Sequence, residues 1–431
     1  MFQEAQPSQL SLFDLPPTQT AVEKIYFQEY RPISQLSSNS PIEFNIASQN
    51  SMEYIDMRRS QMYLKCKLAK SDPAASDNVG PVNLPLHALF SQVDVSIQNK
   101  QISSTSGNYP YKAYIQCLLR YGKDAKKSQL TSQLWSTDTP GAFDDPDAES
   151  GQNLGLYERQ KYFSKGRSVD LMGPIYHDLF GLDRYILNQV PLSLKFYRSK
   201  PEFYLMTNEK SASYAIEIEE MIIKLCKIQC NPAVIYAHAQ TLETTNAKYP
   251  FIKTEVKMMA IPRGQVNFTW DNCVNGIRPL RCAIGFVTLL PLVVSTNLNP
   301  WNFQHYDLSQ ITLSLDGLPV GGNPLRLSFD EISGITTVPA LVNMLETTGK
   351  WMTDSGNAID RGDISKGTAL YVFEVEPQFQ TDYYLSLLKY GNLRIDCQFN
   401  QPLPEAVTCV LYAETPGYFE INKARDVVLQ Q

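Results

Sequence analysis

The chain has 431 residues and a formal net charge of −6, and 43% of its residues are hydrophobic. This length predicts two or three domains, each large enough to bury a core of its own. The negative charge argues against binding of nucleic acid, which requires a concentrated cationic surface. No stretch reaches the roughly 18 apolar residues of a membrane span. Residues 1–15 lack the basic start of a signal peptide, so we expect synthesis inside a cell.

The eight cysteines are predicted to be free thiols. None forms a Cys-x-x-Cys pair, and Cys226 and Cys230 would lie about 13 Å apart on an extended chain, too far for a disulfide. Five others lie in apolar runs, where a buried thiol is expected: Cys66, Cys117, Cys282, Cys397 and Cys409.

The first half of the chain reads as an arm followed by strands. Residues 1–22 are rich in Gln, Ser and Pro with an apolar patch at 10–15, which predicts an arm that docks on a neighbour. Alternating apolar residues then predict strands, with Asn99 and Lys100 closing a hairpin. The predicted strands are 41–48, 61–70, 92–102, 164–171, 185–198 and 212–229.

A helix and a long polar stretch interrupt these strands. Apolar residues three and four apart predict an amphipathic helix over 109–122, with Lys123, Lys126 and Lys127 as its solvated end. The stretch 123–161 is predicted to be a long loop, and its acidic residues suit a solvated exterior.

The second half follows the same plan. A helical patch at 338–345 and a polar loop at 349–367 stand where the first half has its helix and acidic loop. The predicted strands are 252–261, 280–290, 310–318, 326–329, 369–375, 392–399 and 406–413.

The two halves also echo one another in sequence. Residues 92–102 (QVDVSIQNKQI) recur in altered form as QITLSLDGLPV, 218 positions later, and residues 62–69 recur at the same shift. Residues 187–197 recur at a shift of 201. A collinear echo with a drifting offset indicates two copies of one β-rich unit whose loops have diverged.

The sequence therefore predicts an all-β fold of two tandem eight-stranded antiparallel jelly rolls, each with a short helix and a long loop inserted. Neither half has the helix between every pair of strands that a parallel sheet requires. We place the N-terminal arm at 1–22, the first jelly roll at 23–231 and the second at 232–431.

Several stretches, taken together and in this order along the chain, carry a family resemblance. They are GPVNLPLHALFSQVDV (80–95), YPYKAY (109–114), YGKDAKKSQL (121–130), RYILN (184–188), RSK (198–200), NPWNF (299–303), GNLRID (391–396) and VLYAE (410–414). In these stretches the chain resembles the double jelly-roll major capsid proteins encoded by Polinton/Maverick elements and the related adintoviruses of the double-stranded DNA virus lineage.

The resemblance implies a structural protein of the virion. Three subunits would form a trimeric, pseudo-hexagonal capsomer, and capsomers would tile an icosahedral shell that encloses double-stranded DNA. The implied partners are two sister subunits, neighbouring capsomers, a minor (penton) capsid protein and cement proteins, with synthesis in the cytoplasm or nucleus of the host cell. The 24 tyrosines suit the large interfaces of such an assembly. We expect residues 3–20 to clamp a neighbouring capsomer or a cement protein, and the loops 132–162 and 349–367 to cover the outer face.

The sequence offers little for catalysis or cofactors. The four His residues lie far apart, and no nucleophile elbow, phosphate-binding loop or dinucleotide-binding motif is present. We therefore expect no enzyme, no catalytic residue and no cofactor, with His87 in the core. The acidic groups 144–149 and 354–363 do not follow calcium-loop spacing, so no metal site is expected.

Two further features have competing interpretations. Arg361, Gly362 and Asp363 spell the integrin-binding tripeptide and are our candidate receptor contact; the alternative is an ordinary turn around Gly362. Trp301 and Phe303 are expected to anchor a loop between strands, rather than to stack on a base or a sugar.

Two other functions remain open at this point. A minor vertex protein of a virion usually has one jelly roll, which the internal duplication disfavours. A tandem carbohydrate-binding sandwich is expected to carry a secretory signal, which the sequence lacks.

Overall fold

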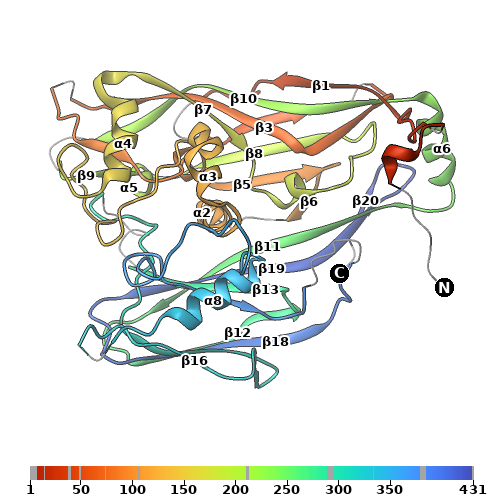
Figure 1. Ribbon diagram of the computed structural model, residues 1–431. Helices are drawn as coiled ribbons and strands as arrows, with labels where there is room; N and C mark the ends of the chain where they lie inside the picture. The colour runs from red at the N-terminus through yellow and green to blue at the C-terminus, as the bar shows by residue number, and fades with distance from the viewer. Residues whose placement is uncertain are drawn as a thin grey trace.

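A computed structural model describes residues 7–13, 15–36, 40–47, 50–72, 74–103, 107–209, 213–288, 296–332, 334–378 and 385–429. Its longer strands form four antiparallel sheets, which pair face to face into two sandwiches, one above the other in Figure 1. The first sandwich draws its strands from the first half of the chain and the second from the second half.

The first sandwich contains eight strands in two sheets of four, in the orders β1-β10-β3-β7 and β2-β8-β5-β6. Leu64 and Cys66 of β3 and Val93 and Val95 of β5 alternate with more exposed residues and are buried between the sheets. The strands are β1 (Val22–Tyr30), β2 (Ile42–Ile46), β3 (Glu53–Lys70), β5 (Phe90–Ile97), β6 (Lys100–Ser103), β7 (Ser168–Pro174), β8 (Leu192–Arg198) and β10 (Tyr214–Cys230). A separate pair joins β4 (Val79–Pro81) to β9 (Leu205–Thr207).

The second sandwich has the orders β11-β19-β13-β17 and β12-β18-β14-β15, and β20 and β16 each extend one sheet. Its strands are β11 (Ala247–Ile261), β12 (Asn267–Ile277), β13 (Arg281–Thr288), β14 (Leu308–Leu315), β15 (Leu318–Pro319), β16 (Leu325–Arg326), β17 (Leu370–Glu374), β18 (Tyr390–Phe399), β19 (Val407–Ile421) and β20 (Val427–Leu429).

The two sandwiches have the same topology. In each, successive main strands alternate between the two sheets, except at one hairpin, β5-β6 or β14-β15. This is the strand order of a jelly roll. The echoed segments occupy equivalent places: β3 matches β13, β5 matches β14 and β8 matches β18. The prediction of two antiparallel jelly rolls is thus confirmed.

Helices are inserted at matching points. After the hairpin of each roll come α2 (Tyr109–Arg120) and α8 (Val338–Thr347), as predicted. Further α-helices are α1 (Pro85–Ala88), α3 (Lys123–Lys127), α4 (Leu154–Phe163), α5 (Pro201–Tyr204) and α6 (Pro232–Thr241). The 3-10 helices are η1 (Ser8–Leu10), η2 (Gln129–Gln133), η3 (Ser164–Gly166) and η4 (Asp178–Gly181).

The prediction of a long loop over 123–161 was wrong. The stretch contains α3, η2 and most of α4, and its acidic residue Asp147 holds a turn together. Asp147 accepts hydrogen bonds from the backbone N–H groups of Glu149 and Ser150, at 3.1 and 3.0 Å. Such side-chain caps give short polar segments a fixed structure that apolar periodicity does not reveal.

Among the longer elements, β1, β12, α4 and α6 were not predicted. β1 lies at the edge of its sheet and mixes Glu23, Lys24 and Glu29 with its apolar residues. β12 is interrupted by a register shift between Trp270 and Val274, which breaks its alternation. The hairpin turn also lies one residue earlier than expected, at Gln98-Asn99, where both residues have positive φ.

His87 lies in the core of the first roll, as predicted. Its Nδ1 is 2.8 Å from the Tyr109 hydroxyl and its Nε2 is 2.9 Å from Gln133 Oε1. Burial lowers the pKa of His87 to about 3, although the bond to Gln133 acts in the opposite direction. The folded protein therefore holds this imidazole neutral at pH values where the unfolded chain protonates it.

We predict a loss of stability in mild acid that depends on His87. Because its folded pKa lies below the unfolded value of 6.5, stability is present above pH 6.5 and is lost as the pH falls toward 3, with a slope of about 1.4 kcal/mol per pH unit. Urea unfolding between pH 7 and pH 4.5 should show a shallower slope for His87→Gln. The control Gln240→Ala, at an exposed position, should keep the wild-type slope, and equal slopes in all three proteins would contradict the assignment.

Candidate functional site

The joint between the two rolls is built around α2, which lies between β5 of the first roll and β11 of the second (Figure 1). Every residue of α2 except Arg120 is buried. The sequence predicted an amphipathic helix, but both sides of α2 are covered because each faces a different roll. The rolls therefore share one helix as a common core element.

Aromatic rings from both rolls pack around α2. The Trp301 ring lies parallel to that of Tyr114, with centroids 4.4 Å apart and an angle of 6°, and Tyr114 stacks on Trp135 at 5.5 Å. Tyr111 meets Trp301 edge-on at 5.2 Å. Trp301 is only 1% exposed, and its indole N–H donates to the carbonyl of Asn83 at 2.9 Å. The prediction that Trp301 anchors a loop is confirmed, and the anchorage lies in the other roll.

Phe303 completes this aromatic cluster and depends on a glycine. It is fully buried, 6.4 Å from Tyr111 and from Tyr114 between ring centroids. A Cβ atom on Gly285 of β13 would lie 2.6 Å from Phe303 Cδ1 and 2.8 Å from Leu370 Cδ2. Only glycine leaves room for the ring at this position.

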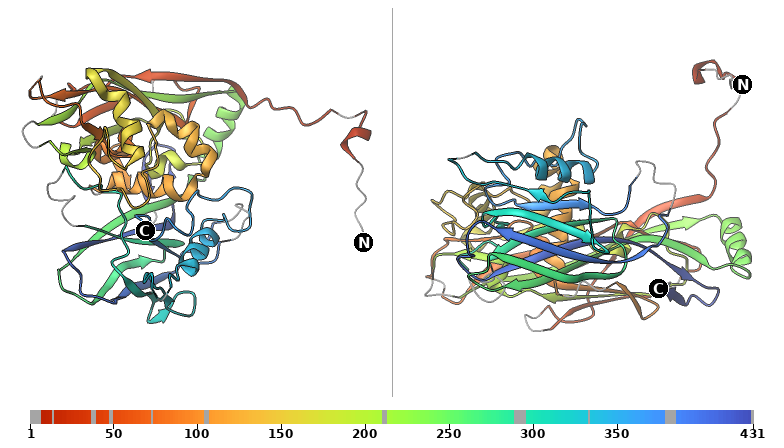
Figure 2. Two further views of the ribbon diagram at one scale, coloured as in Figure 1. Left: turned by 60° about the vertical axis from the view of Figure 1, so that its left-hand side comes forward. Right: turned by 90° about the horizontal axis from the view of Figure 1, so that it is seen from below.

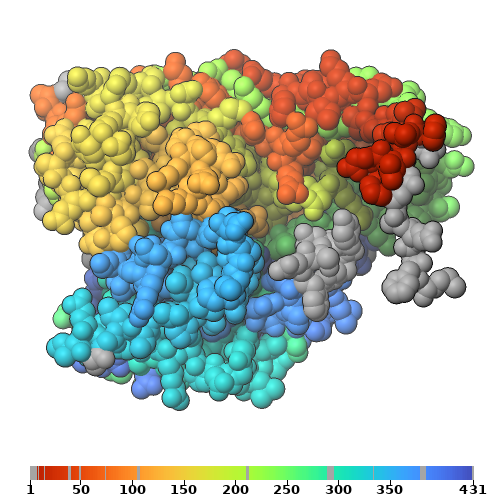
Figure 3. Space-filling view, viewed as in Figure 1, coloured from red at the N-terminus to blue at the C-terminus, as the bar shows by residue number. Residues whose placement is uncertain are grey.

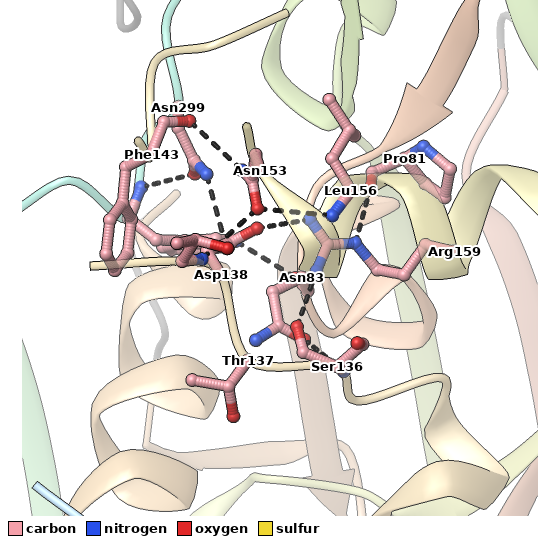
Figure 4. Close-up of polar contacts among 12 residues, drawn as sticks. Pro81, Asn83, Ser136, Thr137, Asp138, Phe143, Asn153, Leu156, Arg159 and Asn299 are labelled. Atoms are coloured by element: carbon pink, nitrogen blue, oxygen red, sulfur yellow. Dashed lines mark hydrogen bonds and ion pairs between the residues drawn. The ribbon is translucent and has the colours of Figure 1, made fainter. Parts of the chain in front are cut away.

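A polar network beside the aromatic cluster fixes the backbone around it (Figure 4). Buried Arg159 of α4 donates to the Pro81 carbonyl at 2.8 Å and to Asp138 Oδ1 at 2.6 Å. The other oxygen of Asp138 accepts from the amide of Asn299 at 3.2 Å, which links the first roll to the second. Arg159 and Asp138 are both hydrogen-bonded, so this network stabilises the structure and is not a reactive site. We call Arg159, Asp138 and Asn299 the bracket.

Asp144 extends the bracket and corrects the expectation of a solvated acidic exterior. Its carboxylate accepts from the backbone N–H of Asn299 at 2.8 Å and from the side chain of Asn302. Burial raises the pKa of Asp144, although both bonds act to lower it. This acidic residue therefore binds the loop that carries Trp301 and does not face the solvent freely.

Two buried ion pairs lie at the joint between the rolls: Lys112 with Asp178, and Arg281 with Glu414. Lys112 of α2 contacts Asp178 at 2.5 Å, with side chains that are 3% and 2% exposed, and Asp178 also accepts from the backbone of Thr254 on β11. Glu414 of β19 is bonded by Arg281 at 2.6 Å and faces Arg120 of α2 at 3.5 Å. Burial alone would raise the pKa of Glu414, but the two arginines outweigh it and the pKa is lowered.

Lys126 connects α3 to the loop that carries the integrin-type tripeptide. Its ammonium donates to the carbonyls of Leu118 at 3.0 Å and Asn357 at 2.6 Å. Burial lowers the pKa of Lys126 to about 8, so the prediction of a solvated helix end was wrong for this residue. Figure 3 shows the orange segment that contains α3 in contact with the light-blue loop.

The tripeptide itself forms a tight turn. Asp360 Oδ1 accepts from the backbone N–H groups of Gly362 and Asp363, at 2.7 and 3.1 Å, and Asp363 Oδ2 accepts from that of Asp360 at 2.9 Å. Arg361 and Gly362 are exposed, whereas Asp363 is half-buried. The exposed side chain of Arg361 donates a long hydrogen bond to the carbonyl of Ile335 at 3.5 Å, while the carboxylate of Asp363 is engaged within the turn.

A cleft of about 1080 Å³ opens between the rolls. Three arginines line it, and each has a partner: Arg58 pairs with Asp183, Arg120 with Glu414, and Arg184 with the carbonyl of Lys248 at 2.6 Å.

Within the described part of the chain, no cluster of three metal-ligating side chains is found. All eight cysteines are free and buried, as predicted. No helix among the described residues has the length and apolarity to cross a membrane.

Comparisons with known proteins extend over nearly the whole chain. No protein-family profile matches it. An uncharacterized protein of Caenorhabditis elegans, F54H12.2, is 23% identical over 430 residues, which cover 96% of this chain and 99% of that protein. The structure of the Sputnik virophage matches with a TM-score of 0.63 at 10% identity, covering 100% of this chain and 93% of that chain. The PBCV-1 virus capsid matches at 0.57 and 9% identity, covering 97% and 99%.

The mavirus major capsid protein also matches, with a TM-score of 0.52 at 11% identity over 100% of this chain and 95% of that chain. These structures are double jelly-roll capsid proteins. This chain has the double jelly-roll fold. At these identities the likeness is one of fold.

We predict that Trp301 is required for the joint. Trp301→Ala should lower the free energy of unfolding by about 3–5 kcal/mol, because it leaves a cavity against Tyr114 and orphans the Asn83 carbonyl. The control Trp351→Ala removes a side chain that is 43% exposed and should change stability by less than about 0.5 kcal/mol. Guanidinium unfolding followed by circular dichroism measures both, and equal effects would contradict the role of Trp301.

Proposed function

We propose that this chain is the major capsid protein of a double-stranded DNA virus or virus-like element. Three copies would form a pseudo-hexagonal capsomer, and capsomers would tile an icosahedral shell around the DNA. One observation carries the proposal: two jelly rolls of the same strand order are joined by a buried shared helix in one chain. Three such chains around an axis supply six similar rolls, which is the outline that hexagonal tiling needs.

Exposed apolar residues support assembly into a larger body. Large hydrophobic side chains are exposed on loops and strand edges of both rolls, where contacts between subunits would cover them. They include Ile25, Phe27, Leu318, Ile332, Leu387 and Tyr390. Obligate subunit interfaces of about 2,000–5,000 Å² would cover surfaces of this kind.

We further propose that the chain is of the Polinton/Maverick and adintovirus type. Three of the stretches that carry the sequence resemblance lie at the joint: 109–114 in α2, 299–303 with Trp301, and 410–414, which ends at Glu414. The order of all eight stretches along the chain supports the proposal.

The rest of the proposal follows from this role. Residues 1–22 are the arm, 23–231 and 232–431 the two rolls, and the segments 132–162 and 349–367 lie on the outer face. Partners are the sister subunits, neighbouring capsomers, a penton protein and cement proteins. The protein resides in the virion after synthesis in the host cytoplasm or nucleus, and it carries out no catalysis.

We predict that the purified chain forms trimers. Light scattering at micromolar concentration should give three times the mass of one chain, and negative-stain microscopy should show pseudo-hexagonal tiles. Pentamers would favour a minor vertex protein, and compact monomers would favour a tandem carbohydrate-binding sandwich. Either result would overturn the proposal.

We also propose that Arg361, Gly362 and Asp363 form a receptor contact on the particle surface. Arg361→Ala tests this without touching the Asp360–Asp363 turn. Loss of a charge-assisted hydrogen bond should reduce attachment of particles to integrin-bearing cells by about tenfold or more. The control Arg326→Ala, at another exposed arginine, should leave attachment unchanged. Equal attachment of both variants would end this hypothesis and leave the capsid proposal intact.

A further inference from the structure

Strand β1 is an edge strand whose free side is not covered by its own chain. It pairs with β10 alone, and among the described residues none outside β10 hydrogen-bonds the backbone of residues 23–30. Ile25 and Phe27 of this strand are 43% and 45% exposed. Figure 1 and Figure 2 show β1 on the side of the first roll that faces away from the second roll. Folded proteins normally cover such an edge, because its unpaired backbone groups can pair with another chain.

Strand β11 is the equivalent of β1 in the second roll, and it is covered. Each of the two is the first strand of its roll and the edge strand of its sheet, next to β10 or β19. The segment between β7 and β8 of the first roll binds β11. Arg184 of that segment donates to the carbonyl of Lys248 at 2.6 Å, and Asp178 accepts from the backbone N–H of Thr254 at 3.2 Å. Tyr249 of β11 is only 3% exposed.

The first roll closes the free edge of β11 in particular. Lys248 and Thr254 are an even number of positions apart, and β11 pairs with β19 without a register shift. In an antiparallel strand the backbone groups of alternate residues point to the same side. Both bonded groups therefore point away from β19, to the side on which β11 has no neighbouring strand.

The second roll carries a segment that corresponds to this cover. It connects β17 to β18, as the segment with Arg184 connects β7 to β8. Leu387, just before β18, and Tyr390, its first residue, are 79% and 62% exposed. Helix α8 is also less covered than its counterpart: three of its ten residues are buried, against eleven of twelve in α2. The described part of the chain contains two rolls, so these surfaces have no third roll to cover.

We propose that β1 of one copy is covered by the second roll of a neighbouring copy, with Leu387 and Tyr390 packed on Ile25 and Phe27. This contact repeats between copies the joint that the chain forms within itself. The second roll then stands to the first roll of the next copy as the first roll stands to the second. Three copies joined in this way close a ring in which the two kinds of roll alternate. The inference rests on the proposed function and deepens it, because it names the surfaces that join the subunits.

Two single-cysteine variants test the contact. Lys24→Cys lies on β1 and Lys389→Cys beside Tyr390; both replace exposed residues, and all eight native cysteines are buried. The variants are mixed under assembly conditions, treated with a short bismaleimide and examined on a denaturing gel. We expect a covalent pair of chains in the mixture, and at least tenfold less of it when Leu387→Asp is added to the second variant.

Two further mixtures serve as controls. Phe27→Asp added to the first variant should reduce the cross-link as strongly as Leu387→Asp does, and circular dichroism identifies either variant if it fails to fold. Lys24→Cys mixed with Glu158→Cys should give no pair. Glu158 is exposed on α4, at the opposite end of the first roll from the start of β1 (Figure 1).

The outcomes separate this inference from the capsid proposal. Trimers or tiles that form without the cross-link would overturn the contact and leave the proposed function standing. A cross-link that persists in both folded Asp variants would also overturn it, because the apolar residues would then not carry the contact. So would a cross-link within one chain of the Lys24→Cys/Lys389→Cys double variant with none in the mixture. Failure of the chain to form any oligomer would overturn both.

Discussion

The structure depends on the burial of one helix between two sheet sandwiches. Because α2 is covered on both sides, neither roll has a complete inner surface without it, and Trp301 of the second roll reaches across to stack on Tyr114 of the helix. Aromatic stacking and burial of large rings are short-range and sensitive to misalignment. The two rolls therefore behave as one body with a fixed mutual orientation, which a tile made of repeated rolls requires.

Charged groups at the joint refine this orientation. Lys112 with Asp178, Arg159 with Asp138 and Glu414 with Arg281 are buried pairs whose hydrogen bonds have defined directions. Removing one partner would leave an uncompensated charge in the interior, at a cost of about 3–5 kcal/mol. Apolar packing holds the two rolls together. The ion pairs disfavour any arrangement in which one roll is shifted relative to the other, because a shift would separate the charged partners.

Much of the fold was readable from the sequence. Alternation at 61–70 and 92–102 predicted β3 and β5, and the shared offset of 218 predicted β13 and β14 as their equivalents. The buried thiols and the core position of His87 also followed from their apolar neighbours. β12 was missed because a bulge breaks its alternation, and α6 because a short uncharged helix has no polar face to mark its period. The bracket around Asp138 and Arg159 was missed entirely.

The sequence by itself determined the two jelly rolls and the helix inserted after each hairpin, since these follow from periodicity and repetition within short windows. Only the tertiary structure decided that α2 is buried on both sides, that Lys126 is buried, that Asp144 binds the loop of Trp301, and that Trp301 packs against the opposite roll. Each of these depends on a partner tens to hundreds of residues away: Asn299 for Asp144, Asn357 for Lys126 and Tyr114 for Trp301. A local pattern shows what a side chain can do, but its environment is set by the segments that the fold brings beside it.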